Sequence, residues 1–389
     1  MRPLRLAITI GYLLLVIATA AMPLLGWQRP YAPLSVLPRP APVTLTIVYG
    51  TEKQRWLEDA AAAFEASGIT ANGASIDIEL RGLGSRESMQ GLLDGSLKPD
   101  VWSPASDLWL ALLNQEWQQR AGRPLVPTSG SDAPQMLVLT PIVLAAWQQR
   151  AAALSDGGQS AWQNLHASIV APEGWGAKGH PEWGTVKWGH ATPTVSNNGL
   201  QALLLMAYDY HRKSSGLTVA DVQDPEFLGW LSEMERAASF NDSSATLMND
   251  MIAFGPSRYD AVATYENLAL AQMANARSRW NDNLVLIYPP ANLWSNHPYA
   301  ILDAEWVTPT DREAARQFRD FLLSRAQQEQ AVQLGFRPAL RDVPLDGAAS
   351  PFTRNASAGV RLDVPTLVEV PEAAVLDALL DAWKRAAQR

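Results

Sequence analysis

Cysteine is absent from the 389-residue chain. Its absence excludes disulfides, thiolate metal sites, a cysteine nucleophile and a lipid-modified N-terminal cysteine. Basic residues are also too few for a nucleic-acid surface, because the formal net charge is -8 and the isoelectric point is near 5.2. Neutralising phosphates requires clustered Lys and Arg, and no run of five basic residues occurs. We therefore expect no nucleic-acid partner.

Catalytic and cofactor-binding motifs are missing as well. The chain contains no HExxH, GxSxG, GxxxxGK(S/T) or GxGxxG pattern. Its five histidines lack the spacing of metal ligands, and each is interpreted as a surface or structural residue: His166, His180, His190, His211 and His297. We expect no enzyme activity and no cofactor. The composition, 47% apolar and 18% charged, is that of a packed globular protein.

The N-terminus carries a long, strongly apolar stretch without charged residues. Residues 6–26 read LAITIGYLLLVIATAAMPLLG and follow Arg2 and Arg5, the order typical of an exported chain. We expect residues 1–27 to form a single-pass membrane anchor that leaves the folded body on the extracytoplasmic side. A cleavable signal ending near Ala18-Thr19-Ala20 is the alternative. The proline-rich residues 28–43 then form an extended linker.

The following residues alternate short apolar runs with amphipathic stretches. The runs TLTIVYG, IDIELRG and DVWSPA enclose helical patterns over 52–66 and 86–93, which predicts βαβαβ order and a parallel sheet. A second alternation occupies residues 139–298, and a long helix is predicted over 311–334. The chain is long enough for two lobes, each with its own core. The predicted fold class is α/β.

Polar turns follow several of the predicted strands, at the edge where open α/β sheets bind ligands. These turns supply hydroxyls and free backbone N–H groups at helix starts, which favour anions. The candidate ligand-binding residues in them are Thr51, Ser85, Ser103, Ser106, Thr194, Ser196 and Asn197. Each is also open to interpretation as an ordinary helix cap. Tyr265 and Glu266 follow another strand, and Glu266 could face a cleft or simply start a helix.

Aromatic residues add a weaker indication. The chain has 15 tryptophans, and Trp102, Trp188 and Trp294 lie beside the candidate turns. Their faces could stack on a sugar or close a pocket, although most tryptophans should pack in the core.

Taken together, six segments resemble bacterial extracellular solute-binding proteins of the type II periplasmic-binding fold, near the molybdate- and sulfate-binding branch. The resemblance covers residues 44–340 and rests on KPDVWSPASDLWLALLN (98–114), TPIVLAAW (140–147), KWGHATPTVSNNGLQALL (187–204), GPSRYDAVATYENLAL (255–270), HPYAILDAEWV (297–307) and GFRPA (335–339).

The resemblance implies two α/β lobes that close on a small solute by hinge bending. Lobe 1 would comprise 44–138 and, with C-terminal helices, 299–389, while lobe 2 would comprise 139–298. Carried over from the family, the solute contacts would be Ser103, Ser106, Thr194, Ser196 and Asn197, with Tyr265 and Glu266 from lobe 2. An ABC-type permease would be the partner.

Two departures from the family keep a second hypothesis open. Family members usually carry a cleaved signal or a lipidated cysteine, whereas an uncleaved anchor resembles a subgroup associated with von Willebrand factor A-type domains. The same fold could then serve as a membrane-tethered sensory or protein-interaction module. The Glu266 carboxylate also fits poorly with a purely anionic solute.

Overall fold

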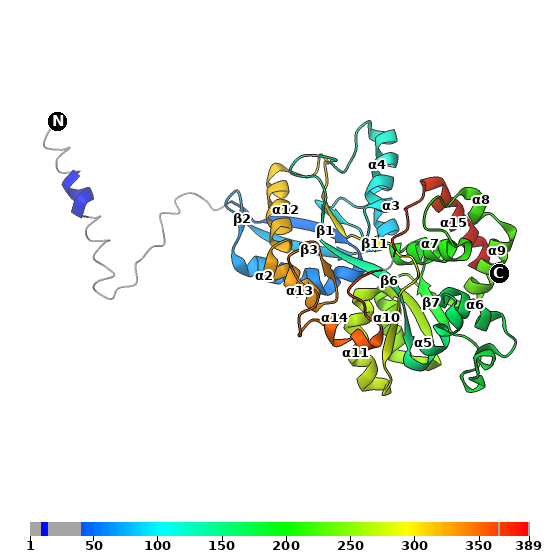
Figure 1. Cartoon of the computed structure of the whole chain (residues 1–389). Helices are drawn as coiled ribbons and strands as arrows, with labels where there is room; N and C mark the ends of the chain where they lie inside the picture. Colours follow the sequence, from blue (N-terminus) through cyan, green and yellow to red (C-terminus); the bar gives the residue numbers. More distant parts are fainter. Residues whose placement is uncertain (1–8, 15–39, 365, 388–389) are drawn as a thin grey trace. The chain divides into compact units, whose positions relative to one another are not determined.

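A computed structural model describes residues 9–14, 40–364 and 366–387. The chain divides into two units, Met1–Ala41 and Pro42–Arg389. In the first, residues 9–14 are helical; the remainder of the predicted anchor and most of the predicted linker lie outside the described residues. Within the described ranges, none of the helices combines the length and the hydropathy that crossing a membrane requires. The second unit contains two β-sheets (Figure 1). We call each sheet, together with the helices that pack on it, a lobe: lobe 1 and lobe 2.

Lobe 1 is built on a six-stranded sheet of order β2-β3-β1-β4-β12-β5. Its strands are β1 (Val43–Tyr49), β2 (Thr70–Ala71), β3 (Ala74–Gly82), β4 (Val101–Ser103), β5 (Gln135–Met136) and β12 (Pro298–Ile301). β1 lies between β3 and β4 and is parallel to both, so the carboxyl ends of all three strands reach one edge. β12 enters the sheet antiparallel to β4.

Helices cover this sheet because each has one apolar side. They are α2 (Gln54–Ser67), α3 (Ser85–Asp94), α4 (Leu108–Ala121), α12 (Pro309–Leu322) and α13 (Arg325–Gln333), and a 3-10 turn, η2 (Thr51–Lys53), precedes α2. On α2, Trp56, Leu57 and Phe64 are buried at helical spacing. Phe64 meets Phe318 of α12 edge to face, with ring centroids 5.1 Å apart.

Lobe 2 is built on a sheet with the path β10-β6-β9-β7-β8. Its strands are β6 (Val138–Trp147), β7 (Trp188–Ala191), β8 (Ala238–Asn241), β9 (Ala261–Tyr265) and β10 (Leu284–Ile287), and the short strands β11 (Trp294–Ser295) and β13 (Arg337–Pro338) pair with β6. β7 is parallel to β8 and β9, whereas β6 is antiparallel to β9.

Nine helices belong to lobe 2 among the described residues, and one of them, α7 (Asn197–His211), is buried almost throughout. They are α5 (Gln148–Leu154), α6 (Ala161–Val170), α7 (Asn197–His211), α8 (Val219–Val222), α9 (Pro225–Ala237), α10 (Ser244–Phe254), α11 (Glu266–Trp280), α14 (Pro351–Arg354) and α15 (Ala373–Ala387). Every residue of α7 from Asn197 to Tyr208 is buried. Gly199 permits this position, because a Cβ there would lie 2.0 Å from the carbonyl oxygen of Ala191.

Two predictions made from the sequence need correction. The helix predicted over 311–334 is two helices, α12 and α13, separated at Leu323 and Ser324. The C-terminal region after β13 does not stay with lobe 1, where residues 299–389 were placed. Phe352 of α14 joins a core cluster of lobe 2, and α15 packs on α7, α8 and α9 (Figure 1).

Candidate functional site

The turns predicted in lobe 1 lie side by side at the carboxyl ends of β1, β3 and β4. The Ser85 hydroxyl accepts a hydrogen bond from the backbone N–H of Ala105 (3.1 Å), which ties the start of α3 to the turn after β4. In that turn the Ser106 hydroxyl accepts a bond from the backbone N–H of Leu108 (3.3 Å) at the start of α4. Three helix starts therefore gather at this edge of the sheet.

From lobe 2, the turns bring Ser196, Asn197 and Tyr265 together. Ser196 is the N-cap residue of α7, but its side chain makes no capping bond. The Asn197 Nδ2 group donates to the Tyr265 hydroxyl (2.9 Å) and to the Ser295 hydroxyl (3.2 Å). Asn197 Oδ1 accepts a bond from Nε1 of Trp109 (2.7 Å), which belongs to lobe 1. The amide of Asn197 thus links the two lobes.

Other contacts join the predicted turns across the lobes. The Thr51 hydroxyl lies 3.2 Å from the Ser243 hydroxyl. The backbone N–H of Arg86 donates to the carbonyl of Val195 (3.2 Å), and a Cβ at Gly84 would lie 2.7 Å from that same carbonyl oxygen. The lobes are therefore in direct contact at their strand ends, which is a closed arrangement. We call this region, formed by the turns of both lobes, the lobe junction.

Two of the candidate ligand-binding residues at the lobe junction are available for a further contact, Ser103 through its hydroxyl and Thr194 through its partial exposure. Ser103 is fully buried, and its hydroxyl has no hydrogen-bond partner among the described residues. Leaving such a group unpaired costs about 1–3 kcal/mol. Thr194 is half-buried and precedes the contact at Val195. Ser103 is consequently the predicted residue with the clearest capacity for an additional polar partner.

Three buried ionisable side chains, whose burial the sequence does not reveal, lie at the lobe junction. Lys53 is fully buried, and its Nζ contacts Glu52 Oε1 at 2.8 Å and the carbonyl of Pro104 at 3.4 Å. His297, also fully buried, places Nδ1 3.1 Å from Glu52 Oε1 and 3.2 Å from Lys53 Nζ. The Glu52 carboxylate folds over Gly50, where a Cβ would lie 2.4 Å from it.

These three groups shift one another's pKa values. Burial acts to raise the pKa of the Glu52 carboxyl, but the Lys53 charge and the hydrogen bond from His297 outweigh it and lower the pKa to about 2. Burial, together with the Lys53 charge, lowers the pKa of His297 to about 4. Burial also lowers the pKa of Lys53, against the attraction of Glu52. His297 is therefore neutral at pH 7, beside an ionised carboxylate.

Glu266 has partners that occupy its carboxylate. Arg337 donates from Nε to Oε2 (2.7 Å) and from Nη2 to Oε1 (2.8 Å), a bidentate ion pair. The Tyr288 hydroxyl also donates to Oε1. Glu266 is fully buried, and the Arg337 side chain is 6% exposed. The sequence left open whether Glu266 faces a cleft or starts a helix. In the structure it starts α11, and its carboxylate lies within a buried ion pair.

Sequence reasoning missed Lys53, Glu52 and His297 because their burial depends on distant contacts. Pro104 lies 51 residues from Lys53, and His297 lies 244 residues from it. The one local signal was the position of Lys53 in the turn directly after β1. Within the ranges described, no group of three or more His, Asp or Glu residues could hold a metal ion.

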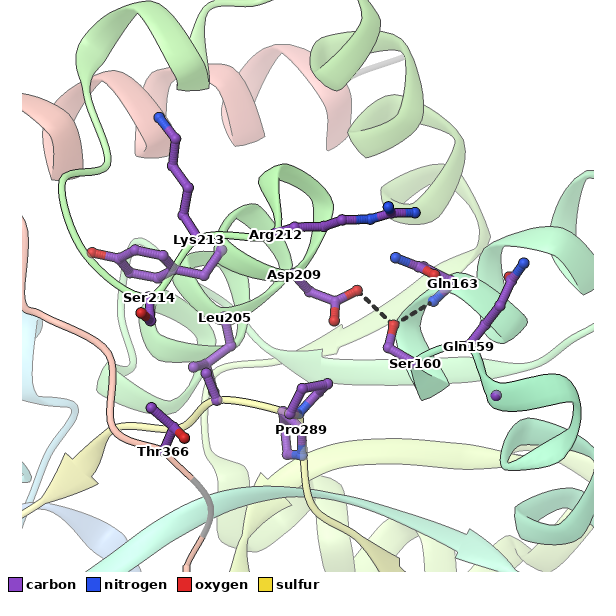
Figure 2. A pocket seen from close by; sticks show the side chains of 14 residues that line it. Gln159, Ser160, Gln163, Leu205, Asp209, Arg212, Lys213, Ser214, Pro289 and Thr366 are labelled. Atoms are coloured by element: carbon purple, nitrogen blue, oxygen red, sulfur yellow. Dashed lines mark hydrogen bonds between the residues drawn. The ribbon is translucent and has the colours of Figure 1, made fainter.

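A cavity of about 650 Å³ lies in lobe 2, outside the lobe junction (Figure 2). It lies between the start of α6 and the end of α7, where the Ser160 hydroxyl donates to Asp209 (2.6 Å). Asp209 is about 18 Å along α7 from Asn197, at 1.5 Å per residue. The residues that line the cavity belong to lobe 2 and its C-terminal region, so closure of the two lobes would not enclose a ligand there.

The fold and the lobe junction define the class of protein: two α/β lobes with the type II periplasmic-binding fold. The chain belongs to the family of bacterial extracellular solute-binding proteins, which matches residues 45–337. This finding confirms the resemblance seen in the sequence. No curated protein matches the chain.

Solved structures agree on the fold. A periplasmic thiamin-binding protein is similar, with a TM-score of 0.60 and 15% identity over 90% of this chain and 97% of the other. Iron-bound HitA from Pseudomonas aeruginosa has a TM-score of 0.56 and 18% identity over 89% and 99%. The sulfate-binding protein SubI from Mycobacterium tuberculosis H37Rv has a TM-score of 0.52 and 15% identity over 86% and 96%. At these identities the likeness concerns the fold alone.

Proposed function

We propose that the chain captures a small polar or anionic solute at the lobe junction and delivers it to an ABC-type importer. Membership of the solute-binding family supports the binding role. Turns from both lobes converge at strand ends, where α/β sheets bind their ligands. The proposal includes no chemical step, so the protein would act by binding and by closing its lobes.

The observation that carries the proposal is the fully buried Ser103 hydroxyl, which lacks a partner among the described residues at the point where the lobes meet. A solute oxygen or N–H group bound there would satisfy this hydroxyl, so the solute would gain a bond that the free protein does not make. The nearby starts of α3, α4 and α7 add backbone N–H groups and the positive ends of helix dipoles.

Charge at the lobe junction is compatible with an anion. Glu266 fits poorly with an anionic solute as an isolated carboxylate, but Arg337 neutralises it through two hydrogen bonds. Glu52 is likewise paired with Lys53.

The experiment that tests the proposal is thermal unfolding of the full chain against oxyanions, amino acids and sugars. A ligand at 100 times its Kd stabilises the folded state by about 2.7 kcal/mol. For a compact unit of roughly 350 residues this raises the Tm by roughly 4 °C. A shift with one chemical class identifies the solute. No shift with any class, at concentrations up to about 10 mM, contradicts the binding proposal.

Ser103→Ala locates the site once a solute is known. We expect at least tenfold weaker binding and no loss of Tm in the free protein, because the hydroxyl makes no bond that the described fold needs and its removal relieves the cost of an unpaired buried group. Ser278→Ala, on the exposed surface of α11, is the matched control and should bind normally. Asn197 is a poorer probe, since its amide makes three hydrogen bonds within the fold.

We also propose that residues 1–27 anchor the protein and leave its body on the extracytoplasmic side. The uncharged stretch after Arg2 and Arg5 supports this. The full chain should then stay with the membrane pellet after alkaline extraction, whereas a chain beginning at Val43 should remain in the supernatant. Release of the full chain by extraction contradicts the anchor.

A further inference from the structure

A second candidate site lies on the outside of the molecule, where both lobes contribute to one groove of about 580 Å³. Lobe 1 supplies Arg55 at the start of α2 and the residues around Leu334 at the end of α13. Lobe 2 supplies Arg277 on α11 and Arg354 on α14. In Figure 1, α13, α14 and α11 lie together on this side of the molecule. We call this feature the arginine groove.

The charge of the arginine groove is of one sign. Three guanidinium groups line it, and no carboxylate is found among the described residues of its wall. Nearby arginines are paired, Arg325 with Glu329 and Arg337 with Glu266. The three groove arginines form no ion pair within the described part of the chain; only Arg277 has a side-chain hydrogen bond, to Asn283 (2.9 Å). This concentration of unpaired positive charge occurs in a chain with a net charge of -8.

A guanidinium group presents a planar fork of donors that matches carboxylate and phosphate oxygens. Three such groups around one groove suit a ligand with several anionic groups better than a single anion. The volume is in the range that small-molecule sites occupy. Ala271, Leu334 and Pro351 supply an apolar wall between the charges. These features together describe a site for a compact organic or inorganic polyanion.

The arginine groove continues toward the lobe junction. Arg55, Ala271 and Leu334 also line the small cavity that reaches Glu52 and Asn267. There Asn267 Nδ2 donates to the backbone carbonyl of Glu52 (3.2 Å), a hydrogen bond between the lobes. A ligand that contacts Arg55 and the lobe 2 arginines together would therefore bridge the lobes next to this bond.

The tight packing of the connecting chain gives the arginine groove a defined wall. Gly335 has φ +87°, and a Cβ there would lie 3.0 Å from the Cα of Asn267. The segment between α13 and β13 therefore passes in direct contact with the start of α11, in a backbone conformation that favours glycine. The wall at Leu334 is held by this packing.

We propose that the arginine groove binds a small molecule carrying two or more carboxylate or phosphate groups, and that this ligand stabilises the closed arrangement of the lobes. The site is separate from the solute site proposed at the lobe junction. Its ligand would be an effector of closure, because it contacts both lobes only when they are together.

Isothermal titration calorimetry of the full chain with inorganic pyrophosphate and with citrate tests the proposal, at pH 7.5 and matched ionic strength. Acetate, which carries a single negative charge, serves as the control ligand. We expect saturable binding of at least one polyanion and at least tenfold weaker binding of acetate. Failure of both polyanions to bind overturns the proposal.

Variants then locate the site. Arg277→Gln with Arg354→Gln should weaken polyanion binding at least tenfold, and Arg55→Gln alone at least threefold. Arg279→Gln removes the same charge from the same helix, outside the arginine groove, and should change affinity less than twofold. An equal loss with Arg279→Gln shows nonspecific attraction and overturns the site. No effect of Arg55→Gln overturns the bridging of the two lobes.

Ser103→Ala separates this inference from the proposed function. Polyanion binding should be unchanged in that variant, since Ser103 does not line the arginine groove. If Ser103→Ala abolishes pyrophosphate binding, the polyanion occupies the lobe junction and the inference about the arginine groove is wrong. Loss of solute binding alone, with polyanion binding intact, leaves the inference standing.

Discussion

Replacing Glu266 by glutamine tests whether the buried ion pair with Arg337 supports the fold. The substitution keeps the shape of the side chain but removes its charge, which leaves the Arg337 guanidinium 6% exposed and without a counter-ion. Breaking a buried pair from one side costs about 3–5 kcal/mol. The introduced amide would still accept one hydrogen bond, so we expect the lower figure, about 3 kcal/mol. For a compact unit of roughly 350 residues this lowers the Tm by roughly 4 °C.

Differential scanning calorimetry at pH 7.5 measures this effect. Glu329→Gln is the matched control, because its ion pair with Arg325 is about half exposed on both sides. Exposed pairs contribute about 0–1 kcal/mol, so the control should lower the Tm by roughly 1 °C or less. If Glu266→Gln shifts the Tm no more than the control does, the argument from burial is refuted.

A double-mutant cycle adds a second check on the same pair. Arg337→Met alone leaves the Glu266 carboxylate buried beside Tyr288 without its cation, and should destabilise the protein by a similar amount. Combined with Glu266→Gln it should cost clearly less than the sum of the single changes, with a coupling energy of about 2 kcal/mol. Additive costs would mean that the two side chains contribute independently.

Three further substitutions test the packing and the electrostatics. His297 has a folded-state pKa of about 4, below its ordinary value of 6.5. Between pH 6.5 and pH 4 the unfolded chain therefore binds a proton that the folded chain does not, and the free energy of unfolding falls as the pH drops. In urea titrations, His297→Asn should remove up to about 3 kcal/mol of this decrease in stability. Gly199→Ala places a Cβ 2.0 Å from the Ala191 carbonyl oxygen and should cost about 1–3 kcal/mol by urea unfolding. Trp383→Phe removes the indole N–H that donates to buried Glu235 (2.9 Å) and should cost about 1–3 kcal/mol, measured in the same way.

Each of these expectations has a result that would contradict it. If the free energy of unfolding of His297→Asn changes with pH as steeply as that of the unmodified protein, the pH dependence belongs to another group. Normal stability of Gly199→Ala would show that α7 can move away from the end of β7. Unchanged stability of Trp383→Phe would mean that Glu235 does not need the indole N–H. Trp280→Phe is the control for the loss of an indole, because the Trp280 N–H donates its hydrogen bond at a half-buried position.

The strands and helices around β1 could be predicted from the sequence because their periodicity is local. Apolar residues alternate in β3 and recur at helical spacing in α2. The turns of the candidate site were found for a related reason, since the carboxyl ends of parallel strands share one edge. The break between α12 and α13 was missed because neither Gly nor Pro marks Leu323 and Ser324.

The buried group of Glu52, Lys53 and His297 could not be predicted in the same way. Glu52 and Lys53 are adjacent charges in a turn, a pattern typical of the surface. Their burial follows from the packing of His297, which lies far away in the sequence. The link between Trp109 and Asn197 likewise joins residues 88 positions apart. Such contacts depend on how the two lobes meet, which local patterns do not encode.

The position of β12 in the lobe 1 sheet has a consequence for biosynthesis. β12 separates β4 from β5, yet the ribosome adds it about 200 residues after β4. All strands on the path β10-β6-β9-β7-β8 are synthesised before it. The nascent chain therefore holds the βαβαβ segment of lobe 1 as an open sheet, with β4 as an unpaired edge, while the five strands on the lobe 2 path have already been synthesised. The five strands on the lobe 2 path can therefore pair first, with β13 joining β6 later, whereas the lobe 1 sheet can close only after β12 has been synthesised.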